Sequence, residues 1–460
     1  DEYKIFEFLK FQRIFNGNYD KLSKVLMSYN KLEFKKNKLT IEEYWNPKFN
    51  IENKNLDWFA HRLNFLIDQS IERKFSGNEK RLVFFLSGGI DSRSFLSKIH
   101  TKIKTESVTF APSLNNEAKI AKEVSDALNV KNSFFSLGAD AYKAHYKKMS
   151  LLSYGNSSFD HSIFAAIKKV FFNKFDISSS GWGIDIYFQG YYIPLIKKKI
   201  FNYFPTFFYK LDKSIFEKTT VKFFINNLPY RNKLKNLSKL FNKNYKTKFD
   251  KILKKQINQV CNKSKSVANN PVDAYNHMVV NDIFRHYSFA NLQSMSYCKK
   301  NTCIMFDNDL LEFYYTIPYK FLINKKLYKH YVTKFINNKI SNIKTGNENI
   351  KYSLSPLRKT ILWYFDKILI KFKLRKKTIF YNPLSERSWP SRSEVLKNKK
   401  MNKVIAEFKK NNFFSRLKSF NNNALDNFLK NTETKPDWYS ASTLLYLVTL
   451  NEVFKSIYKK

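Results

Sequence analysis

The chain has few glycine, cysteine and acidic residues. Only 10 of its 460 residues are Gly, while Lys, Asn, Phe, Ile and Tyr are abundant together, a bias typical of a whole genome rather than of a binding surface. The three cysteines, Cys261, Cys298 and Cys303, lack the spacing of a metal site and are too few for a disulfide framework. This usage favours a reducing, cytoplasmic setting.

Several functional signatures are also missing. No apolar run is long enough to span a bilayer, and no signal peptide is visible. The chain contains no GxxxxGK[ST] loop, which excludes a Walker A nucleotide site. It also contains no CxxC pair. With 43% apolar residues the chain is nevertheless globular, and its length allows two or three lobes.

The charge is strongly basic, with 82 Lys and Arg against 38 Asp and Glu, a formal net charge of +44. Such a balance usually indicates nucleic acid or an anionic membrane surface as partner. The lysines are scattered along the chain, so there is no strong case for nucleic acid, and only a weak association with anionic surfaces stays open. Residues 357–376 form a basic amphipathic stretch, for which a solvated helix face over core is favoured over a membrane or RNA contact.

The most informative segment is SGGIDSR at residues 87–93, which follows the apolar run 82–86 and precedes an expected helix. A strand, a Gly turn and a helix together direct backbone N–H groups at a phosphate, and Gly88 and Gly89 let the backbone approach the anion. Asp91 would repel bare phosphate, so its presence favours Mg²⁺ between the acid and the phosphates.

A second acidic turn, SGWGID, occupies residues 180–185 after the expected strand 175–179. It can lie beside the first turn at the same sheet edge. Asp91 and Asp185 could then share Mg²⁺ with a triphosphate, and the cation would offset the charge of a pyrophosphate leaving group. The alternative is a plain Gly turn whose Asp caps a helix.

Alternating strand and helix patterns surround both turns. Expected strands occupy 82–86, 107–111, 133–137 and 175–179, and expected helices occupy 57–76 and 116–128. This alternation predicts an α/β fold with a parallel, doubly wound sheet and a ligand at the carboxyl ends of its strands. Residues 1–56 are expected to form short strands and turns, 57–200 the α/β core, and 201–460 a mostly helical lobe.

The two acidic turns, SGGxDSR and SGxGxDxxFxGY, resemble the synthetase domain of the asparagine synthase family, within the superfamily of ATP pyrophosphatases that carry an SGGxDS loop. Residues 107–110 and 116–121 resemble the family's second strand and helix, which flank the adenine. Residues 301–310 resemble its ExRxPFLDxxL segment, and Tyr44-Trp45 resembles the YW that closes its amino-terminal domain. The resemblance covers nearly all of residues 1–350 and implies a sheet of the adenine nucleotide alpha-hydrolase-like type.

The resemblance implies an enzyme that uses ATP to adenylate a small-molecule carboxylate, releases pyrophosphate, and transfers the acyl group to ammonia or another amine. It also implies site residues. The pyrophosphate loop would comprise Ser87, Gly88, Gly89, Asp91, Ser92 and Arg93, with Val108 beside the nucleotide, Gly181 and Gly183 shaping the second loop, Asp91 and Asp185 holding Mg²⁺, and Lys344 steadying the α-phosphate.

The chain departs from the family at several positions. Trp182 stands where the family often has Glu or Tyr and can neither accept nor donate a catalytic proton. Thr302 and Ile304 replace the Arg and Pro of the ExRxPFLD segment, so recognition of a substrate other than aspartate is expected. Asp1 is not the amino-terminal Cys of a glutaminase. Residues 1–56 are therefore expected to be the last strands of that domain. Either the upstream part of the domain was lost from this sequence, or the enzyme uses free ammonia or another amine in place of glutamine.

Two other functions stay open. A tRNA- or nucleotide-modifying relative would fit the charge, although no Cys is placed as a sulfur carrier. A catalytically degenerate scaffold that binds ATP would fit Trp182 and the lost Arg. Asp160-His161 could contact substrate, against the alternative of a helix-capping Asp and a packed His.

Overall fold

A five-stranded parallel sheet forms the centre of the chain. The computed structural model describes residues 1–15, 26, 29–153, 155–217, 221–228, 232–235, 237–283, 288–346, 348–380 and 389–457. The strands lie in the order β5-β4-β3-β6-β9, and each neighbouring pair is parallel. Their bounds are β3 (Arg81–Phe85), β4 (Lys104–Ala111), β5 (Asn132–Ser136), β6 (Ile177–Ser180) and β9 (Asn301–Cys303).

The four strands expected from the sequence are confirmed within three residues at each end. In β3, residues 82–85 are all buried, as a parallel strand covered on both faces requires. In β6 the run Ile-Ser-Ser-Ser is also fully buried, so three serines form part of the core of the sheet.

The order of the strands creates a switch point between β3 and β6. From β3 the chain adds β4 and then β5 on one side, and it later adds β6 and β9 on the other. In such open sheets a crevice for ligands opens outside the carboxyl ends of the two strands where the direction of winding reverses. The SGGIDSR loop follows β3, and the SGWGID loop follows β6, so both lie at this point.

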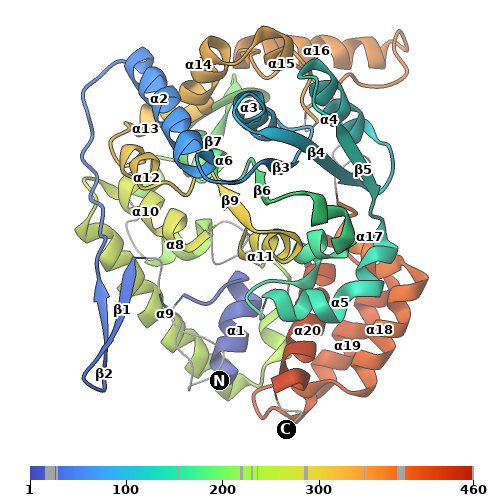
Figure 1. Cartoon of the computed structure of the whole chain (residues 1–460). Helices are drawn as coiled ribbons and strands as arrows, with labels where there is room; N and C mark the ends of the chain where they lie inside the picture. The colour runs from blue at the N-terminus through green and yellow to red at the C-terminus, as the bar shows by residue number, and fades with distance from the viewer. Residues whose placement is uncertain are drawn as a thin grey trace.

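Helices cover both faces of the sheet, which confirms the doubly wound arrangement (Figure 1). On one face α15 contacts α3 and α4, while α14 contacts α2. On the other face η1 packs on the sheet, since the Phe164 ring centroid lies 4.7 Å from Phe85 and 4.9 Å from Phe110. The first layer comprises α2 (Leu56–Phe75), α3 (Ile90–Ile99), α4 (Asn116–Ala127), α14 (Lys326–Phe335) and α15 (Asn338–Ser341), and the second η1 (Phe159–Ala166), α5 (Ala139–Ser153) and α11 (Phe289–Cys298).

The second half of the chain is mostly helical, as expected, and within the described residues none of its helices is both long and apolar enough to cross a bilayer. Two further helices of the first half are η2 (Lys169–Lys174) and α6 (Ile184–Phe188). After residue 200 the helices not yet named are α7 (Ser214–Glu217), α8 (Val221–Asn227), η3 (Leu237–Leu240), α9 (Lys243–Ser266), α10 (Pro271–Ile283), α12 (Asn308–Tyr314), α13 (Tyr319–Leu322), η5 (Ile323–Lys325), α16 (Pro356–Lys371), α17 (Arg392–Lys397), α18 (Lys399–Lys410), η6 (Phe413–Arg416), α19 (Asn422–Thr434) and α20 (Trp438–Ile457). Two antiparallel hairpins accompany them, β1 (Asn30–Lys35) with β2 (Lys38–Glu43), and β7 (Leu195–Ile200) with β8 (Phe204–Leu211).

The expectation of strands is wrong for the first residues, where α1 (Glu2–Phe11) is a helix. The Asp1 carboxylate caps it by accepting the Tyr3 N–H at 3.0 Å. The helix is buried almost all round between α9 and α20, with the Phe6 ring 5.5 Å from Phe249 and the Phe8 ring 5.0 Å from Tyr446. A fully buried helix lacks the polar face that would distinguish it from a strand in the sequence. The β1–β2 hairpin does supply short strands in 30–43.

The boundary expected at residue 200 does not separate the sheet from the rest. It falls at the turn between β7 and β8, which pair from Leu195 to Leu211. The edge strand β9 comes from residues 301–303, about 120 residues after β6, its neighbour. The α/β core is therefore completed by segments from the helical half of the chain.

Candidate active site

The SGGIDSR loop is held by its own side chains. The Ser92 hydroxyl lies 2.9 Å from the Ser87 hydroxyl and accepts the Ser87 N–H at 3.2 Å. The Ser87 hydroxyl accepts the Gly89 N–H at 3.2 Å. The loop thus ends β3 in a tight turn from which α3 begins, with Gly89 at its N-cap. The N–H groups of Ser87 and Gly89 already have partners in this conformation.

Gly88 packs against a carboxylate from the next helix. Its N–H donates to Glu117 Oε1 at 2.9 Å, and its carbonyl accepts the Gly346 N–H at 2.9 Å. A Cβ at position 346 would lie 1.9 Å from Glu117 Oε2, and one at position 88 would lie 2.8 Å from the same atom. Gly88, Glu117 and Gly346 therefore fit together only because both backbone positions lack a side chain.

Arg93 joins this loop to the segment 340–346. Its guanidinium donates to the carbonyls of Gly88 at 2.7 Å and Gly89 at 3.1 Å, and to those of Ile343 at 2.8 Å and Lys344 at 2.9 Å. The side chain is fully buried. We expected its charge to face phosphate, but these carbonyls take up the guanidinium, which makes Arg93 a positioning residue.

The second loop packs directly on the first. A Cβ at Gly181 would lie 2.6 Å from both Cα and N of Ser92. Gly183, with φ of 99°, adopts a conformation that side chains disfavour, and a Cβ there would also meet Met305 at 2.9 Å. These two glycines bring the loop close to the start of α3 and direct the chain into α6, which carries Asp185 in its first turn.

The charges of Asp91 and Asp185 interact across the two loops. Burial and the charge of Asp185 raise the pKa of Asp91, while the charge of Lys325 opposes the rise. Burial likewise raises the pKa of Asp185, again opposed by Lys325. Among the described residues, no cation lies within ion-pairing distance of either carboxylate. The two acids are thus partly buried, and their negative charge is only partly offset.

Two neutral side chains orient the acid of the first loop. Gln189, at the end of α6, donates from Nε2 to Asp91 Oδ1 at 2.5 Å. Tyr352 in turn donates its hydroxyl to Gln189 Oε1 at 3.1 Å. Both side chains are buried, so this chain of hydrogen bonds links Asp91 to the segment that precedes α16.

The site suits a divalent cation and a bound polar molecule. Its two carboxylates are hard oxygen ligands of the kind Mg²⁺ prefers. The buried hydroxyls of Ser179 and Ser180, at the carboxyl end of β6, have no hydrogen-bond partner within the described residues. Buried polar atoms normally have partners, so these two hydroxyls are available to water or to a bound molecule at this edge. No group of three His, Cys, Asp or Glu side chains is gathered for a metal in the described part of the chain, so other ligands would come from outside these side chains.

The remaining expected site residues lie at the same rim with different roles. Val108 is buried in β4, and its carbonyl accepts the Leu86 N–H at 2.9 Å just before the first loop. Lys344 touches the loop only through its backbone, because its carbonyl binds Arg93 while its side chain is exposed. The Trp182 carbonyl accepts from Cys303 Sγ at 3.4 Å, which links the second loop to β9.

Four residues of the site were missed by the sequence analysis, namely Glu117, Gln189, Lys325 and Tyr352. Glu117 is remote in sequence from the Gly88 that it binds, and Gln189 is 98 residues from Asp91 although it stands inside the second quoted motif. Lys325 and Tyr352 come from segments more than 100 residues after either acid, so no local spacing signalled the interactions of these four residues. Lys325 has the one local anomaly, a left-handed backbone at φ of 58° that it shares with Asn324 at 57°. Such strain often marks functional positions, but it cannot be read from sequence.

Asp160 and His161 belong to a separate buried cluster. Arg392 Nε donates to Asp160 Oδ2 at 2.9 Å and Nη1 donates to the Ser442 hydroxyl at 2.6 Å, while Nη2 approaches His161 Nε2. Burial would raise the pKa of Asp160, but Arg392 holds it below its usual value. Burial lowers the pKa of His161 to about 4. This cluster, here called the Arg392 network, ties η1 to α17 and α20.

Comparison with known proteins agrees with this geometry. A protein-family model described as asparagine synthase matches residues 62–404, about three quarters of the chain. The matched region includes every strand of the central sheet, both acidic loops and the segment 340–352. No curated protein matches the chain.

Proposed function

The chain belongs to the asparagine synthase family, and on this premise we propose that it is an ATP-dependent carbon–nitrogen ligase. The proposed reaction has two steps. A carboxylate oxygen of the substrate attacks the α-phosphorus of ATP, and the bond to pyrophosphate breaks. The nitrogen of ammonia or another amine then attacks the acyl carbon, an amide bond forms, and AMP leaves.

The observation that carries the proposal is the pair of acids at the switch point. Each follows a glycine loop at the carboxyl end of a neighbouring strand, and the loops touch so closely that Gly181 has no room for a Cβ beside Ser92. Partial burial of two interacting acids without a paired cation costs stability. Strongly perturbed acids of this kind favour a functional role over a structural one.

Mg²⁺ fits this site as a cofactor. Asp91 and Asp185 would hold it, and when bound it would neutralise charge on the departing pyrophosphate. Gln189 and Tyr352 keep the Asp91 carboxylate oriented through their hydrogen bonds. Lys325 supplies a positive charge that acts on both acids and would stabilise the negative charge that develops on phosphate.

The first loop would bind pyrophosphate by exchanging partners. The N–H groups of Ser87, Gly88 and Gly89 now donate to Ser92, Glu117 and Ser87 side chains. Phosphate oxygens would replace these acceptors, and the freed serine hydroxyls could donate to the same phosphate. Glu117 would have to leave Gly88, since its carboxylate repels the anion. We infer that Mg·ATP binding moves Glu117.

A screen for pyrophosphate release tests the proposal. Candidate carboxylates, aspartate among them, are added to the full chain with Mg·ATP, and hydroxylamine serves as a trap for the activated acyl group. The expected result is pyrophosphate and AMP in equal amounts, dependent on one carboxylate, with a hydroxamate product. Binding of Mg·ATP without turnover across a broad screen would instead favour an ATP-binding scaffold. Trp182, which stands in place of a proton-transferring residue, is the reason to include this outcome.

A further inference from the structure

Helix α16 leaves an apolar stripe uncovered. Leu357, Ile361, Phe365 and Ile368, with Phe372 just beyond the helix, are each between 51% and 67% exposed. At 3.6 residues per turn these five positions fall within about 80° of arc. An amphipathic helix normally turns such a stripe toward the core.

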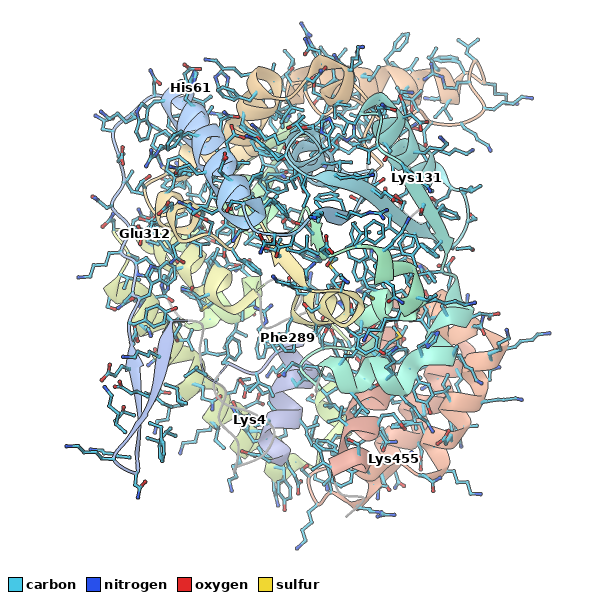
Figure 2. The ribbon with its side chains drawn as sticks, viewed as in Figure 1. Lys4, His61, Lys131, Phe289, Glu312 and Lys455 are labelled. Atoms are coloured by element: carbon cyan, nitrogen blue, oxygen red, sulfur yellow. The ribbon has the colours of Figure 1, made fainter. Side chains whose placement is uncertain are left out.

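The rest of α16 packs on the chain, since Lys359, Thr360 and Asp366, which fall about 100° to 160° from the centre of the stripe, are buried. The Thr360 hydroxyl accepts the Phe207 N–H at 3.0 Å, and the Tyr364 hydroxyl donates to the Pro205 carbonyl at 3.0 Å. Strand β8 therefore holds the polar and aromatic side of the helix, and the apolar stripe faces away from the protein. In Figures 1 and 2, α16 runs along the outer edge of the molecule with side chains projecting outward.

The tip of the β7–β8 hairpin extends this surface. Phe201 and Tyr203 are 83% and 81% exposed, and the Phe204 ring centroid lies 6.3 Å from that of Tyr364 on α16. Phe201 adopts φ of 49°, a conformation that bulky residues disfavour. Twelve of the 28 large exposed apolar side chains among the described residues lie in this hairpin and in 357–374.

The same surface is strongly basic. Residues 356–377 contain eight Lys and Arg and one acid, Asp366, which is buried and paired with Arg375 at 2.5 Å. The hairpin residues 195–211 contain four Lys and no acid. On the helix, Lys367 and Lys371 flank the apolar stripe on one side and Arg358 flanks it on the other.

We propose that α16 and the tip of the β7–β8 hairpin, together the α16 surface, dock onto an anionic lipid bilayer. The stripe would enter the boundary between headgroups and acyl chains, and the flanking lysines would contact lipid phosphates. A basic helix with an exposed Leu, Ile and Phe face is typical of helices that lie in a membrane surface. Since the one acid in residues 356–377, Asp366, is buried and residues 195–211 contain none, the exposed charge of the surface favours an anionic partner. The protruding aromatic tip favours a partner into which rings can insert.

Docking would act close to the candidate active site. The Asn324 side chain exchanges two hydrogen bonds with the Tyr209 backbone of β8, at 2.8 and 3.0 Å, and Lys325 follows immediately. Tyr352, which binds Gln189, stands three residues before Ser355, the N-cap of α16. The α16 surface is thus continuous with two walls of the site.

Vesicle sedimentation of the full chain tests this proposal. Vesicles of phosphatidylcholine with and without phosphatidylglycerol are compared at low and high salt. The variant carries Ile361→Ser and Phe365→Ser. Its control carries Leu151→Ser and Phe65→Ser, which remove side chains 45% and 49% exposed on α5 and α2. We expect partition onto anionic vesicles to fall roughly a hundredfold in the variant and less than about twofold in the control, because two apolar side chains leave the interface.

Three outcomes would overturn the proposal. Equal binding of variant and control would show that net charge alone attracts the chain. A wild type that dimerises in sedimentation equilibrium, with Ile361→Ser and Phe365→Ser abolishing the dimer, would assign the stripe to a second copy. RNA binding lost in the variant but kept in the control would assign it to nucleic acid. Pyrophosphate release without lipid is a separate readout, so failure of the proposed function leaves this test intact.

Discussion

Two partly buried clusters that contain aspartate, the Arg392 network and the pair of acids at the switch point, differ in how the charge of the acid is balanced. In the Arg392 network, Asp160 is paired with a guanidinium 2.9 Å away, and its pKa is held below the usual value although burial would raise it. At the switch point, the hydrogen bond that Asp91 receives within the described residues comes from neutral Gln189, and desolvation together with Asp185 raises the pKa of Asp91. One acid is neutralised within the fold, and the other is left short of positive charge.

This difference separates a structural role from a functional one. A buried acid paired with a cation stabilises the arrangement that surrounds it, and breaking the pair leaves an isolated buried charge. A partly buried pair of acids without a paired cation also costs stability, and such a cost is expected where a ligand or metal completes the charge balance. Variants at the switch point should therefore lose activity and keep their stability. Variants of the Arg392 network should lose stability and keep their activity per folded molecule.

Asp91→Asn and Asp185→Asn are expected to show the largest difference between loss of activity and loss of stability. Each is expected to lower pyrophosphate release at least roughly a thousandfold, because the charge that would hold Mg²⁺ is lost. Thermal unfolding should be unchanged or shifted upward, since the neutral amide removes the burial cost of a carboxylate. Asp126→Asn, on the exposed face of α4, is the control. A strong loss of stability in the first two variants would contradict the functional assignment.

Asp160→Asn tests the other side of the comparison. It leaves the Arg392 guanidinium buried without its carboxylate, for which we expect a loss of about 3–4 kcal/mol in the free energy of unfolding. Chemical denaturation measures the loss. Pyrophosphate release per folded molecule should change little. If activity disappears while stability is kept, Asp160 acts on substrate and the network is not purely structural.

The same network predicts acid sensitivity. The pKa of His161 falls from 6.5 to about 4 on folding, so the unfolded chain binds the extra proton between these values. The contribution of neutral His161 to the free energy of unfolding is complete above about pH 6.5. It decreases by up to about 3 kcal/mol as the pH falls toward 4. His161→Gln should flatten this part of the stability profile, while the control His61→Gln, whose side chain is exposed on α2, should leave the slope as in the wild type. An unchanged slope in His161→Gln would show that other groups carry it.

Gly181→Ala tests the contact between the two acidic loops. The added methyl group would lie 2.6 Å from the Ser92 backbone, so the loops must separate. We expect a loss of about 2 kcal/mol in stability and weaker nucleotide binding. Gly138→Ala is the matched control, because nothing lies within 4 Å of its Cβ position. Equal behaviour of the two variants, measured by thermal unfolding and Mg·ATP titration, would mean that the loops do not depend on their close approach.

Tyr352→Phe should have the smallest effect. It removes the hydroxyl that holds Gln189 but leaves the ring in place, for a cost of about 1 kcal/mol in transition-state stabilisation, or roughly fivefold in rate. Tyr364→Phe removes a comparable hydrogen bond to the Pro205 carbonyl, away from the acids, and should leave the rate unchanged. A rate equal to wild type in Tyr352→Phe would remove Tyr352 from the orienting chain.

The sequence predicted the parts of this architecture that follow from local patterns. Continuous apolar runs predicted four strands of the sheet, and Gly turns with acids predicted both loops at one edge. The sequence did not predict that β9, from residues 301–303, completes the sheet, because three residues carry no strand signal. It placed α1 wrongly because a helix buried on all sides has no polar face to set its period. Glu117, Lys325 and Tyr352 join the site only through tertiary contacts.

The expected role of Arg93 shows the same limit. An arginine within a phosphate-loop pattern carries the right charge, but the direction of its side chain is set by carbonyls 250 residues away in the sequence. Lys325, which the pattern did not mark, supplies the positive charge near both acids. Local sequence therefore located the loops, whereas the charge balance between them depended on the packed structure.

A double-mutant cycle on Mg·ATP binding tests the central claim most directly. Calorimetric titration of wild type, Asp91→Asn, Asp185→Asn and the double variant gives the free energy with which the two positions interact. If both acids act on one metal-bound nucleotide, either single change removes most of the affinity, and the double variant binds about as weakly as each single one. Losses that simply add, or wild-type affinity in both single variants, would contradict a shared site.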